Sequence, residues 1–283
     1  MASFTNYATL TYNGNTTVSN TVTGELTEVI TASKTAAATD YSPSGSVTYT
    51  VSLINSGTAD LTGLTVTDDL GGYTFDGGTV YPLSYADGSI LYFIDGVLQP
   101  APAVTAGPPM VISGISVPAG GSTMLVYETN VTSFAPLAAG GSVTNTATVS
   151  GDGISAPITA SETVSVEEAP SLSILKSISP ETVTENSVLT YTFEIENTGN
   201  TEAAVADNVV LSDTFNPVLS DITVTLDGSV QRVGVNYTYD EPTGVFATVA
   251  GQIIVPAATY SQGEDGSWTV TPGTVTIVVS GTV

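Results

Sequence analysis

Two lysines, Lys34 and Lys176, are the side chains best suited to chemistry in this chain. The 283 residues include only three lysines and arginines together, and no histidine or cysteine. The two lysines occupy equivalent places, in Ala32-Ser33-Lys34 and in Ile174-Leu175-Lys176, each near the start of a predicted domain. Strand alternation puts each lysine on a face that is otherwise apolar. We therefore expect both lysines to point towards a core.

Each lysine has an aspartate that is predicted to face the same core. Asp68 alternates with Leu64 and Val66, and Asp213 alternates in the same way with Leu211. An isolated ammonium or carboxylate group is costly to bury, so a lysine and an aspartate aimed into one core should meet.

An asparagine completes the set in the first domain. The segment Val143-Thr144-Asn145-Thr146-Ala147-Thr148-Val149 carries Asn145 in the middle of its apolar face. The same pattern opens the chain as Phe4-Thr5-Asn6-Tyr7-Ala8-Thr9-Leu10, where Asn6 takes the place of Asn145. The second domain has no asparagine at this position. Asn6 of another molecule is therefore the candidate to supply it.

Lysine, aspartate and asparagine in an apolar core can form an isopeptide bond. Burial lowers the pKa of a lysine amine and raises that of a carboxyl group. The neutral amine is a nucleophile, and the protonated acid can polarise the carboxamide and help ammonia to leave. A buried ion pair with asparagine as hydrogen-bond partner is the alternative, and spacing alone does not decide between the two. The predicted sets are Lys34 and Asn145 with Asp68 as assisting acid within one chain, and Lys176 and Asn6 with Asp213 as assisting acid between subunits.

The composition excludes several classes of function. A formal net charge of −24 would repel nucleic-acid phosphates and anionic membranes, so we expect no nucleic-acid partner. No apolar run is long enough to predict membrane insertion. Without cysteine there are no disulfides or thiolate metal sites, and without histidine the commonest general base and metal ligand is missing. We expect no cofactor, no metal and no enzyme activity other than autocatalytic isopeptide formation.

The chain is internally repeated, and the repeat predicts its domains. Short strands with regular turn signals and no helical period predict an all-β chain of two tandem immunoglobulin-like antiparallel β-sandwiches plus an N-terminal donor β-hairpin. The predicted parts are 1–30 for the hairpin and linker, 31–166 for the first sandwich and 167–283 for the second. The matching segments are 47–57 with 189–199, 64–68 with 209–213, 94–99 with 226–231, and 123–131 with 275–283.

The hairpin is predicted to be the closing piece that the second domain lacks. The first domain continues beyond the repeat to the Asn145 strand and a hairpin at Gly151-Asp152-Gly153, whereas the second repeat stops at Val283. At the N-terminus we expect a first strand over 4–10, a turn at Asn13-Gly14-Asn15 and a return strand over 16–22 that Gly24 breaks. The side chains predicted to fill the groove of a neighbouring subunit are Phe4, Ala8, Leu10 and Tyr12.

Several segments carry a family resemblance: residues 49–55 with Gly57, Val66-Thr67-Asp68, residues 134–137 and residues 144–149. Together they resemble the bacterial surface repeat catalogued as domain of unknown function eleven, over nearly the whole chain. The resemblance implies stalk or fibre modules of a cell or spore surface, and some related stalk domains carry intramolecular isopeptide bonds. The truncated second repeat and the N-terminal hairpin depart from the family pattern.

We predict a structural subunit of an extracellular, pilus-like fibre on a cell or spore surface. Its partner would be itself, joined head to tail by hairpin donation, with a host or matrix surface as a further partner. The alternatives are a monomeric surface stalk, and a carbohydrate-binding module. A hydrolase is disfavoured because no pair of acids has a recognisable site context. The aromatic residues that would form a sugar-binding face are Tyr73, Tyr81, Tyr85 and Tyr92.

Overall fold

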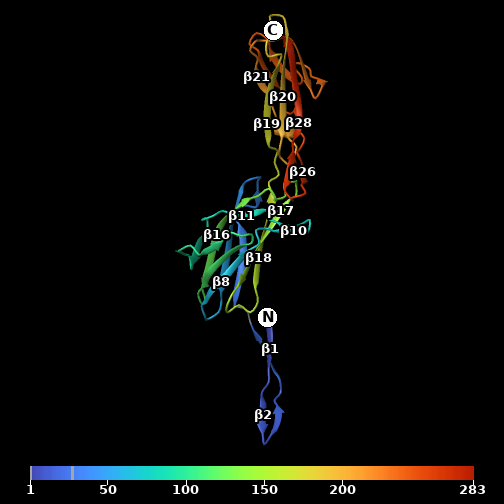
Figure 1. Cartoon of the computed structure of the whole chain (residues 1–283). Coiled ribbons are helices and arrows are strands. Elements are labelled where there is room, and N and C mark those ends of the chain that lie inside the picture. Colours follow the sequence, from blue (N-terminus) through green and yellow to red (C-terminus); the bar gives the residue numbers. More distant parts are fainter. Residues whose placement is uncertain (1, 27–28) are drawn as a thin grey trace. The chain divides into compact units, whose positions relative to one another are not determined.

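The computed structural model describes residues 2–26 and 29–283, and they form short β-strands joined by turns (Figure 1). The only helical element of the described residues is the single 3-10 turn η1 (Val205–Asp207). The same residues include no helix that could cross a membrane. The chain is therefore all-β, as the spacing of turn residues predicts.

The N-terminal residues form a two-part β-hairpin. β1 (Ala2–Asn6) pairs with β4 (Val22–Leu26), and β2 (Thr9–Tyr12) pairs with β3 (Asn15–Val18). The turn lies at the predicted place, with φ of 51° at Asn13 and 79° at Gly14. Positive φ at both central residues is what a two-residue hairpin turn requires.

Gly24 does not end the return strand, contrary to the sequence-based prediction. It lies inside β4, directly opposite Phe4. A Cβ atom at this position would lie 2.4 Å from the Phe4 ring. The glycine is therefore the residue that lets the aromatic ring pack over the facing backbone.

The first strand of the hairpin is also interrupted, where continuous pairing from residue 4 to 10 was predicted. The pairing moves from Asn6 opposite Val22 to Thr9 opposite Val18, so residues 7–8 face the three residues 19–21. The extra residue lies on the return strand, which bulges, and β1 and β2 are separate strands for this reason.

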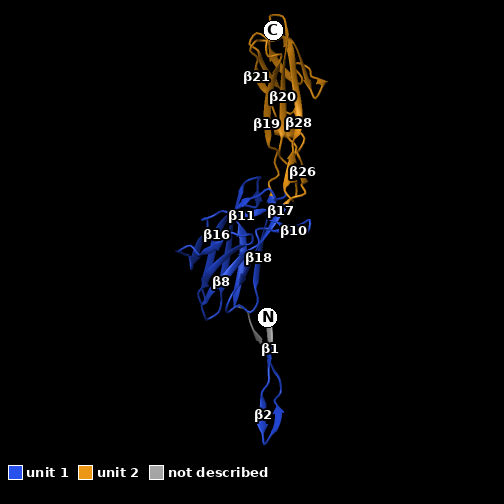
Figure 2. Cartoon of the chain, viewed as in Figure 1, with its two compact units in different colours: residues 1–136, 142–165 blue, residues 137–141, 166–283 orange. Residues whose placement is uncertain are grey.

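The first sandwich packs two antiparallel sheets around one core, in the unit that Figure 2 colours blue. One sheet has the order β13-β12-β16-β7-β5, with β11 also paired to β16, and the other has the order β14-β15-β8-β17-β18-β6. A separate small hairpin joins β9 (Tyr73–Phe75) to β10 (Gly78–Val80). The strands of the first sheet are β5 (Ile30–Ala36), β7 (Ser46–Asn55), β11 (Leu83–Tyr85), β12 (Leu91–Ile94), β13 (Val97–Gln99) and β16 (Ser122–Val131). Those of the second are β6 (Asp40–Tyr41), β8 (Leu61–Asp68), β14 (Ala103–Thr105), β15 (Met110–Val117), β17 (Ser142–Ser150) and β18 (Ile158–Val166).

The chain enters and leaves the first sandwich at opposite ends. Ile30 pairs with Asn55, at the end where β8 begins and where Ser150 of β17 pairs with Thr65. The last strand, β18, ends at Val166, beside the start of β17 at Ser142. At about 3.3 Å per residue, the two ends are separated by roughly 25–30 Å.

The second sandwich, orange in Figure 2, contains residues 166–283 together with 137–141. Its larger sheet has the order β19-β20-β28-β22-β23, and its smaller sheet has the order β21-β25-β24. In Figure 1, β19, β20 and β28 lie side by side. The strands are β19 (Leu172–Ser179), β20 (Val188–Asn197), β21 (Ser212–Thr214), β22 (Ser220–Leu226), β23 (Ser229–Val230), β24 (Tyr237–Asp240), β25 (Val245–Thr248), β28 (Gly273–Thr282) and the added hairpin of β26 (Thr259–Gln262) and β27 (Trp268–Thr271).

The second sandwich has an open edge where the first is closed. In the first sandwich β8 is paired on both sides, with β15 and with β17. Its counterpart β21 is paired with β25 alone among the described strands. No strand in the described part of this sandwich corresponds to β17 or β18.

A buried asparagine explains one of the sequence repeats. The Asn55 side chain donates to the carbonyl oxygens of Ala59 and Val117 and accepts from the Gly57 amide. Asn197 does the same in the second sandwich, where it donates to Thr201 and accepts from Gly199. Each asparagine holds the turn that carries the chain from one sheet to the other.

Replacing Asn55 by Ala should destabilise the first sandwich by about 2–3 kcal/mol, because three backbone groups lose the buried side chain that they bond to. Thermal or denaturant unfolding would measure the loss. Asn130→Ala is the matched control: this side chain is exposed, so the change should stay within about 0.5 kcal/mol. Equal stabilities for the two variants would contradict the role given to Asn55.

Candidate functional site

Lys34 and Asp68 form an ion pair in the core of the first sandwich. Lys34 lies on β5 and Asp68 at the end of β8, in the facing sheet, and the distance from Lys34 Nζ to Asp68 Oδ2 is 2.5 Å. Both side chains are completely buried. The predicted meeting of the two groups is therefore found in the structure.

Asp68 has two further partners. The Tyr127 hydroxyl donates to Oδ2, the same oxygen that Lys34 contacts, and the Leu70 amide donates to Oδ1 at 2.9 Å. Tyr127 lies on β16, directly opposite Tyr49 on β7. Two donors from one sheet and one from its own turn thus hold the carboxyl group in a single orientation.

Asn145 completes this cluster but is left without a hydrogen bond. It lies on β17 two residues from Ala147, which pairs with Asp68, and β17 contacts β5 across the core. Asn145 is fully buried, yet neither its oxygen nor its nitrogen has a partner. A buried amide with no partner costs roughly 1–3 kcal/mol per group, so this side chain needs an explanation beyond packing.

Tyr49 is the second buried group without a partner. Its ring is fully buried, and its hydroxyl makes no hydrogen bond in good geometry. The Lys34 ammonium lies 4.6 Å from the centre of its ring. Burial raises the pKa of Tyr49, Asp68 adds to the rise, and the neighbouring Asn145 carboxamide acts in the opposite direction. The Tyr49 hydroxyl is therefore influenced by the Asn145 carboxamide but forms no hydrogen bond of good geometry with it.

Burial also dominates the electrostatics of the amine. It lowers the pKa of Lys34, and the attraction of Asp68 only partly offsets this effect. Transfer of a proton from Lys34 to Asp68 would leave two neutral groups in an apolar core and yield a nucleophilic amine. With the Asn145 carboxamide in the same cluster, the groups required for an isopeptide bond are together.

The second sandwich repeats the ion pair in an exposed form. Lys176 Nζ, on β19, lies 2.5 Å from Asp213 Oδ2, on β21. The side chains are 43% and 17% exposed, where those of Lys34 and Asp68 are 0% exposed. The Lys176 ammonium also lies 4.5 Å from the centre of the Tyr191 ring, as Lys34 lies over Tyr49.

The rest of the face around Lys176 is exposed too. Leu172, Ile174 and Ile178 share its side of β19 by alternation, and they are 41%, 55% and 42% exposed. In the first sandwich the residue equivalent to Leu172 is Ile30, which is buried. Lys176 thus lies on the face of β19 that meets Asp213, and this face is exposed. The described residues include no strand on the far side of β21 that could cover it.

The N-terminal hairpin exposes apolar side chains of its own. Phe4, Leu10 and Tyr12 are 55%, 66% and 73% exposed, and Asn6 and Ala8 are exposed as well. Asn6 contacts neither Lys176 nor Asp213 through any described hydrogen bond, so the structure of the single chain assembles only the first of the two predicted sets.

Tyr127 and Tyr49 were missed by the sequence analysis as members of the site. Both stand at inward positions of apolar strands, where a tyrosine is ordinarily a core residue. The signal that could have found Tyr49 is the repeat itself, because Tyr191 stands at the same place beside Lys176. Tyr127 has no such signal, since the equivalent residue opposite Tyr191 is Val279.

The aromatic residues considered for sugar binding do not form an exposed face. Tyr92 is buried and its hydroxyl contacts Ser116, while Tyr85 accepts a hydrogen bond from the Ile90 amide. Tyr73 donates to the carbonyl oxygen of Phe134, and Tyr81 is half-buried. These tyrosines anchor loops of the first sandwich.

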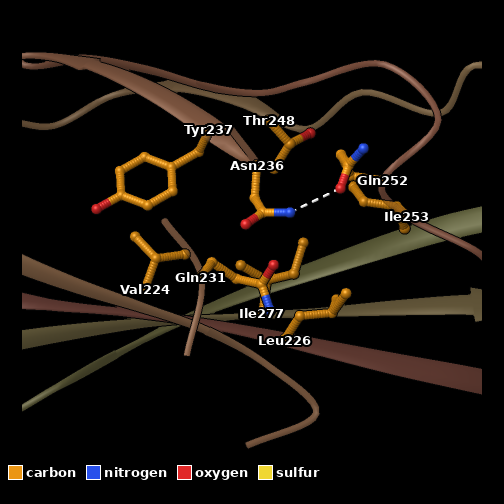
Figure 3. Close-up of a pocket in the computed structure, with 9 residues that line it drawn as sticks. All are labelled: Val224, Leu226, Gln231, Asn236, Tyr237, Thr248, Gln252, Ile253 and Ile277. Atoms are coloured by element: carbon orange, nitrogen blue, oxygen red, sulfur yellow. Dashed lines mark hydrogen bonds between the residues drawn. The ribbon is translucent and has the colours of Figure 1, made fainter. Parts of the chain in front are cut away.

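The second sandwich also holds one small pocket, lined by apolar residues that include Val224, Leu226 and Ile277. Figure 3 shows the Asn236 side chain above it, donating to Gln252. The pocket has a volume of about 10 Å³, which is room for one water molecule and not for an organic ligand. The described residues likewise contain no group of three or more acids placed to hold a metal ion.

No family model matches this chain, and no curated protein matches it. Solved structures do match. They include BcpA, the major pilin subunit of Bacillus cereus, with 16% identity, a TM-score of 0.38, and coverage of 96% of this chain and 73% of that chain. Domains D2 and D3 of the major pilin SpaD from Corynebacterium diphtheriae match with 12% identity, a TM-score of 0.33, and coverage of 85% and 88%.

The pilus backbone RrgB of Streptococcus pneumoniae also matches, with 12% identity and a TM-score of 0.32 over 86% of this chain. The match spans only 55% of the RrgB chain. These structural neighbours are pilin subunits, but at such identities and TM-scores the likeness gives no basis for carrying their function over to this chain.

The intact mass of the purified chain should be lower than the sequence mass by one ammonia, because Lys34 and Asn145 are expected to be joined. Asp68→Ala should restore the full mass, since it removes the acid that takes the proton from Lys34. Asp87→Ala is the control: it removes an exposed acid from the segment between β11 and β12, and it should keep the lower mass. A native chain of full mass would leave the Lys34–Asp68 pair as a plain buried ion pair.

Proposed function

We propose that this protein is the structural subunit of an extracellular fibre, assembled head to tail by donation of the N-terminal hairpin into the second sandwich of the next subunit. Isopeptide bonds from Lys34 to Asn145 within a chain and from Lys176 to Asn6 between chains reinforce it. The protein has no enzyme activity other than the formation of these bonds.

One observation carries the proposal: the open groove and the exposed hairpin have complementary patterns. The groove presents an apolar face with Lys176 and Asp213 in its middle. The hairpin presents an apolar face with Asn6 in its middle. In the first sandwich the same two patterns are already joined, as β5 and β8 with β17.

The pairing register of the first sandwich predicts how the hairpin enters. There Ala147 pairs with Asp68, and Asn145 lies two residues before Ala147 on β17, the strand that contacts β5. Ala8 is the residue equivalent to Ala147, so it would pair with Asp213 on the free edge of β21. Asn6 would then take the place of Asn145, beside Lys176.

Both hairpins also supply a second strand. Asn145 pairs with Glu162 of β18, and Asn6 pairs with Val22 of β4. The inserted hairpin would therefore add two strands to β21, which restores the sheet order of the first sandwich. A strand that adds to an open edge gains its backbone hydrogen bonds as well as its apolar contacts.

Chain topology favours a second copy as the acceptor. In the inserted hairpin Leu26 would lie at the Ser179 end of the second sandwich, as Val166 lies at the Ala36 end of the first. Three residues, 27–29, lead from Leu26 to Ile30, which spans roughly 14 Å at most. The first sandwich of one subunit would thus follow directly on the second sandwich of another, in a heterologous contact that continues into an open filament.

The apolar contacts alone would hold the subunits together. Each large apolar side chain that becomes fully buried contributes about 1.5–3 kcal/mol, and Phe4, Leu10 and Tyr12 are all available. The bond from Lys176 to Asn6 would then make the contact irreversible. Such a fibre belongs outside the cell, on a cell or spore surface.

Deleting residues 1–26 should abolish polymerisation, because it removes the hairpin proposed to enter the second sandwich of the next subunit. Electron microscopy and sedimentation of the purified protein would show monomers or amorphous aggregates in place of filaments. Filaments of normal length from the truncated chain would refute hairpin donation and favour a stalk with a different self-contact.

A point variant sharpens this test. Leu10→Asp puts a charge on the face that enters the groove and should prevent assembly. Its control, Thr9→Asp, puts the same charge on the opposite face of the same strand and should leave assembly largely intact. If both variants polymerise equally, the face assignment is wrong.

Asn6→Ala should still form filaments but should lose their resistance to heat. Its apolar neighbours remain, so assembly proceeds, whereas no carboxamide is left for Lys176. Boiling in denaturant followed by gel electrophoresis would then give monomer, while the unaltered protein gives a ladder or stays at the top of the gel.

Thr5→Ala is the matched control for this prediction, because it removes a polar side chain one residue away on the other face. It should keep the ladder. Unaltered filaments that run as monomer after boiling would exclude the inter-subunit bond, although hairpin donation could still hold.

A further inference from the structure

We infer that the Tyr49 hydroxyl is a catalytic donor of the isopeptide reaction, and that Tyr191 has the same role in the second sandwich. The inference deepens the proposed function and rests on the isopeptide bonds proposed above. In this role the hydroxyl stabilises the negative charge that develops on the carboxamide oxygen during attack by the lysine amine.

The first observation is that the Tyr49 hydroxyl is buried and unsatisfied. Its ring is fully buried, and no described group gives it a hydrogen bond in good geometry. Phenylalanine would fill the same space without this cost. A polar group retained under these conditions, next to another unsatisfied side chain, points to a role in chemistry.

The second observation is the position of the hydroxyl relative to the reacting groups. Lys34 Nζ lies 4.6 Å from the centre of the Tyr49 ring, and Tyr49 stands opposite Tyr127, whose hydroxyl contacts Asp68. Asn145 lies on β17, two residues from the partner of Asp68, and its side chain lowers the pKa of Tyr49 against the effect of burial. The orphaned atoms of Asn145 include its oxygen. Asp68 is occupied with Lys34, Tyr127 and Leu70, so Tyr49 is the neutral donor that remains for this oxygen.

The third observation is that the second sandwich repeats this tyrosine. Tyr191 pairs with Val279 on the neighbouring strand, and Tyr49 pairs with Tyr127 at the equivalent position of the first sandwich. Both sites thus have a tyrosine whose ring lies beside the lysine ammonium. Only the first site has a second tyrosine, Tyr127, whose hydroxyl donates to the aspartate. In the open groove Tyr191 makes only a long hydrogen bond of 3.4 Å, to the Asn216 carbonyl oxygen.

The reaction balances with the groups present. A proton passes from the Lys34 ammonium to Asp68, and the neutral amine attacks the Asn145 carbonyl carbon. The C–N bond forms, and the carbonyl electron pair moves to the oxygen, where Tyr49 donates its hydrogen bond. The carbonyl re-forms as the bond to the amide nitrogen breaks. Ammonia leaves with the proton that the attacking nitrogen loses through Asp68.

Tyr49→Phe tests this role in the full chain. The chain would be made by cell-free translation, synthesis stopped, and samples quenched in acid at intervals for intact-mass measurement. Removal of one donor to a developing oxyanion typically slows a reaction roughly 100- to 1,000-fold, so loss of ammonia should slow by that factor. Loss of ammonia at the unaltered rate would overturn the inference.

Tyr41→Phe is the matched control. This tyrosine is also buried in the first sandwich, but its hydroxyl donates to the Pro136 carbonyl oxygen, 2.5 Å away. The control should lose ammonia at the unaltered rate. If even the unaltered chain never loses ammonia, the isopeptide proposal itself is wrong. That outcome differs from loss of ammonia at the unaltered rate in Tyr49→Phe, which would overturn only the role given to Tyr49.

A stability measurement separates catalysis from structure. In the Asp68→Ala background, where no bond forms, Tyr49→Phe should leave the melting temperature unchanged or raise it, since it removes an unsatisfied hydroxyl. A large fall would assign Tyr49 a structural role and overturn the inference. Tyr191→Phe gives an independent second test, because it should slow the appearance of the boiling-resistant ladder without stopping assembly.

Discussion

The structure depends on the placement of one positive charge in an apolar core. The Lys34 side chain is completely buried, so a carboxylate has to reach its ammonium from the facing sheet, and Asp68 does so at 2.5 Å. That contact fixes the distance between β5 and β8, and Tyr127 and Leu70 in turn fix the carboxyl group. An ion pair of this kind contributes little net stability compared with apolar packing. Its presence is better explained by the chemistry that a desolvated amine and acid can perform.

The two sandwiches contain the same pair of lysine and aspartate, which is buried in the first and partly exposed in the second. In the first, β17 and β18 cover the set and the amine is desolvated. In the second, the described strands end at β21, and the same lysine keeps contact with water. Solvation is therefore the difference between them. In the proposed assembly the strand donated by the next subunit would cover the second set, which would link bond formation to assembly without any separate switch.

Much of this could be predicted from sequence, because a strand has a period of two. Alternation alone placed Lys34, Asp68 and Asn145 in one core, and positive-φ turn residues such as Asn13-Gly14 marked the hairpins. The parts that failed depend on neighbours across strands. Gly24 alone predicts the end of a strand, and only its pairing with Phe4 explains why it lies inside one. The interruption at residues 7–8 follows from an extra residue on the return strand. Tyr127 belongs to the site because the packing of the two sheets brings its hydroxyl to Asp68 in the facing sheet.

The opposite placement of Ile30 and Val166 determines how the first sandwich would carry a mechanical load. Tension along the proposed fibre would enter through β5 and leave through β18. With Lys34 bonded to Asn145, that load passes from the entering strand to β17 through a covalent bond, and residues 35–144 are left outside the loaded path. The sheets would not need to resist unzipping, so a sandwich of modest thermodynamic stability could keep its length under a pull that would unfold an uncrosslinked one.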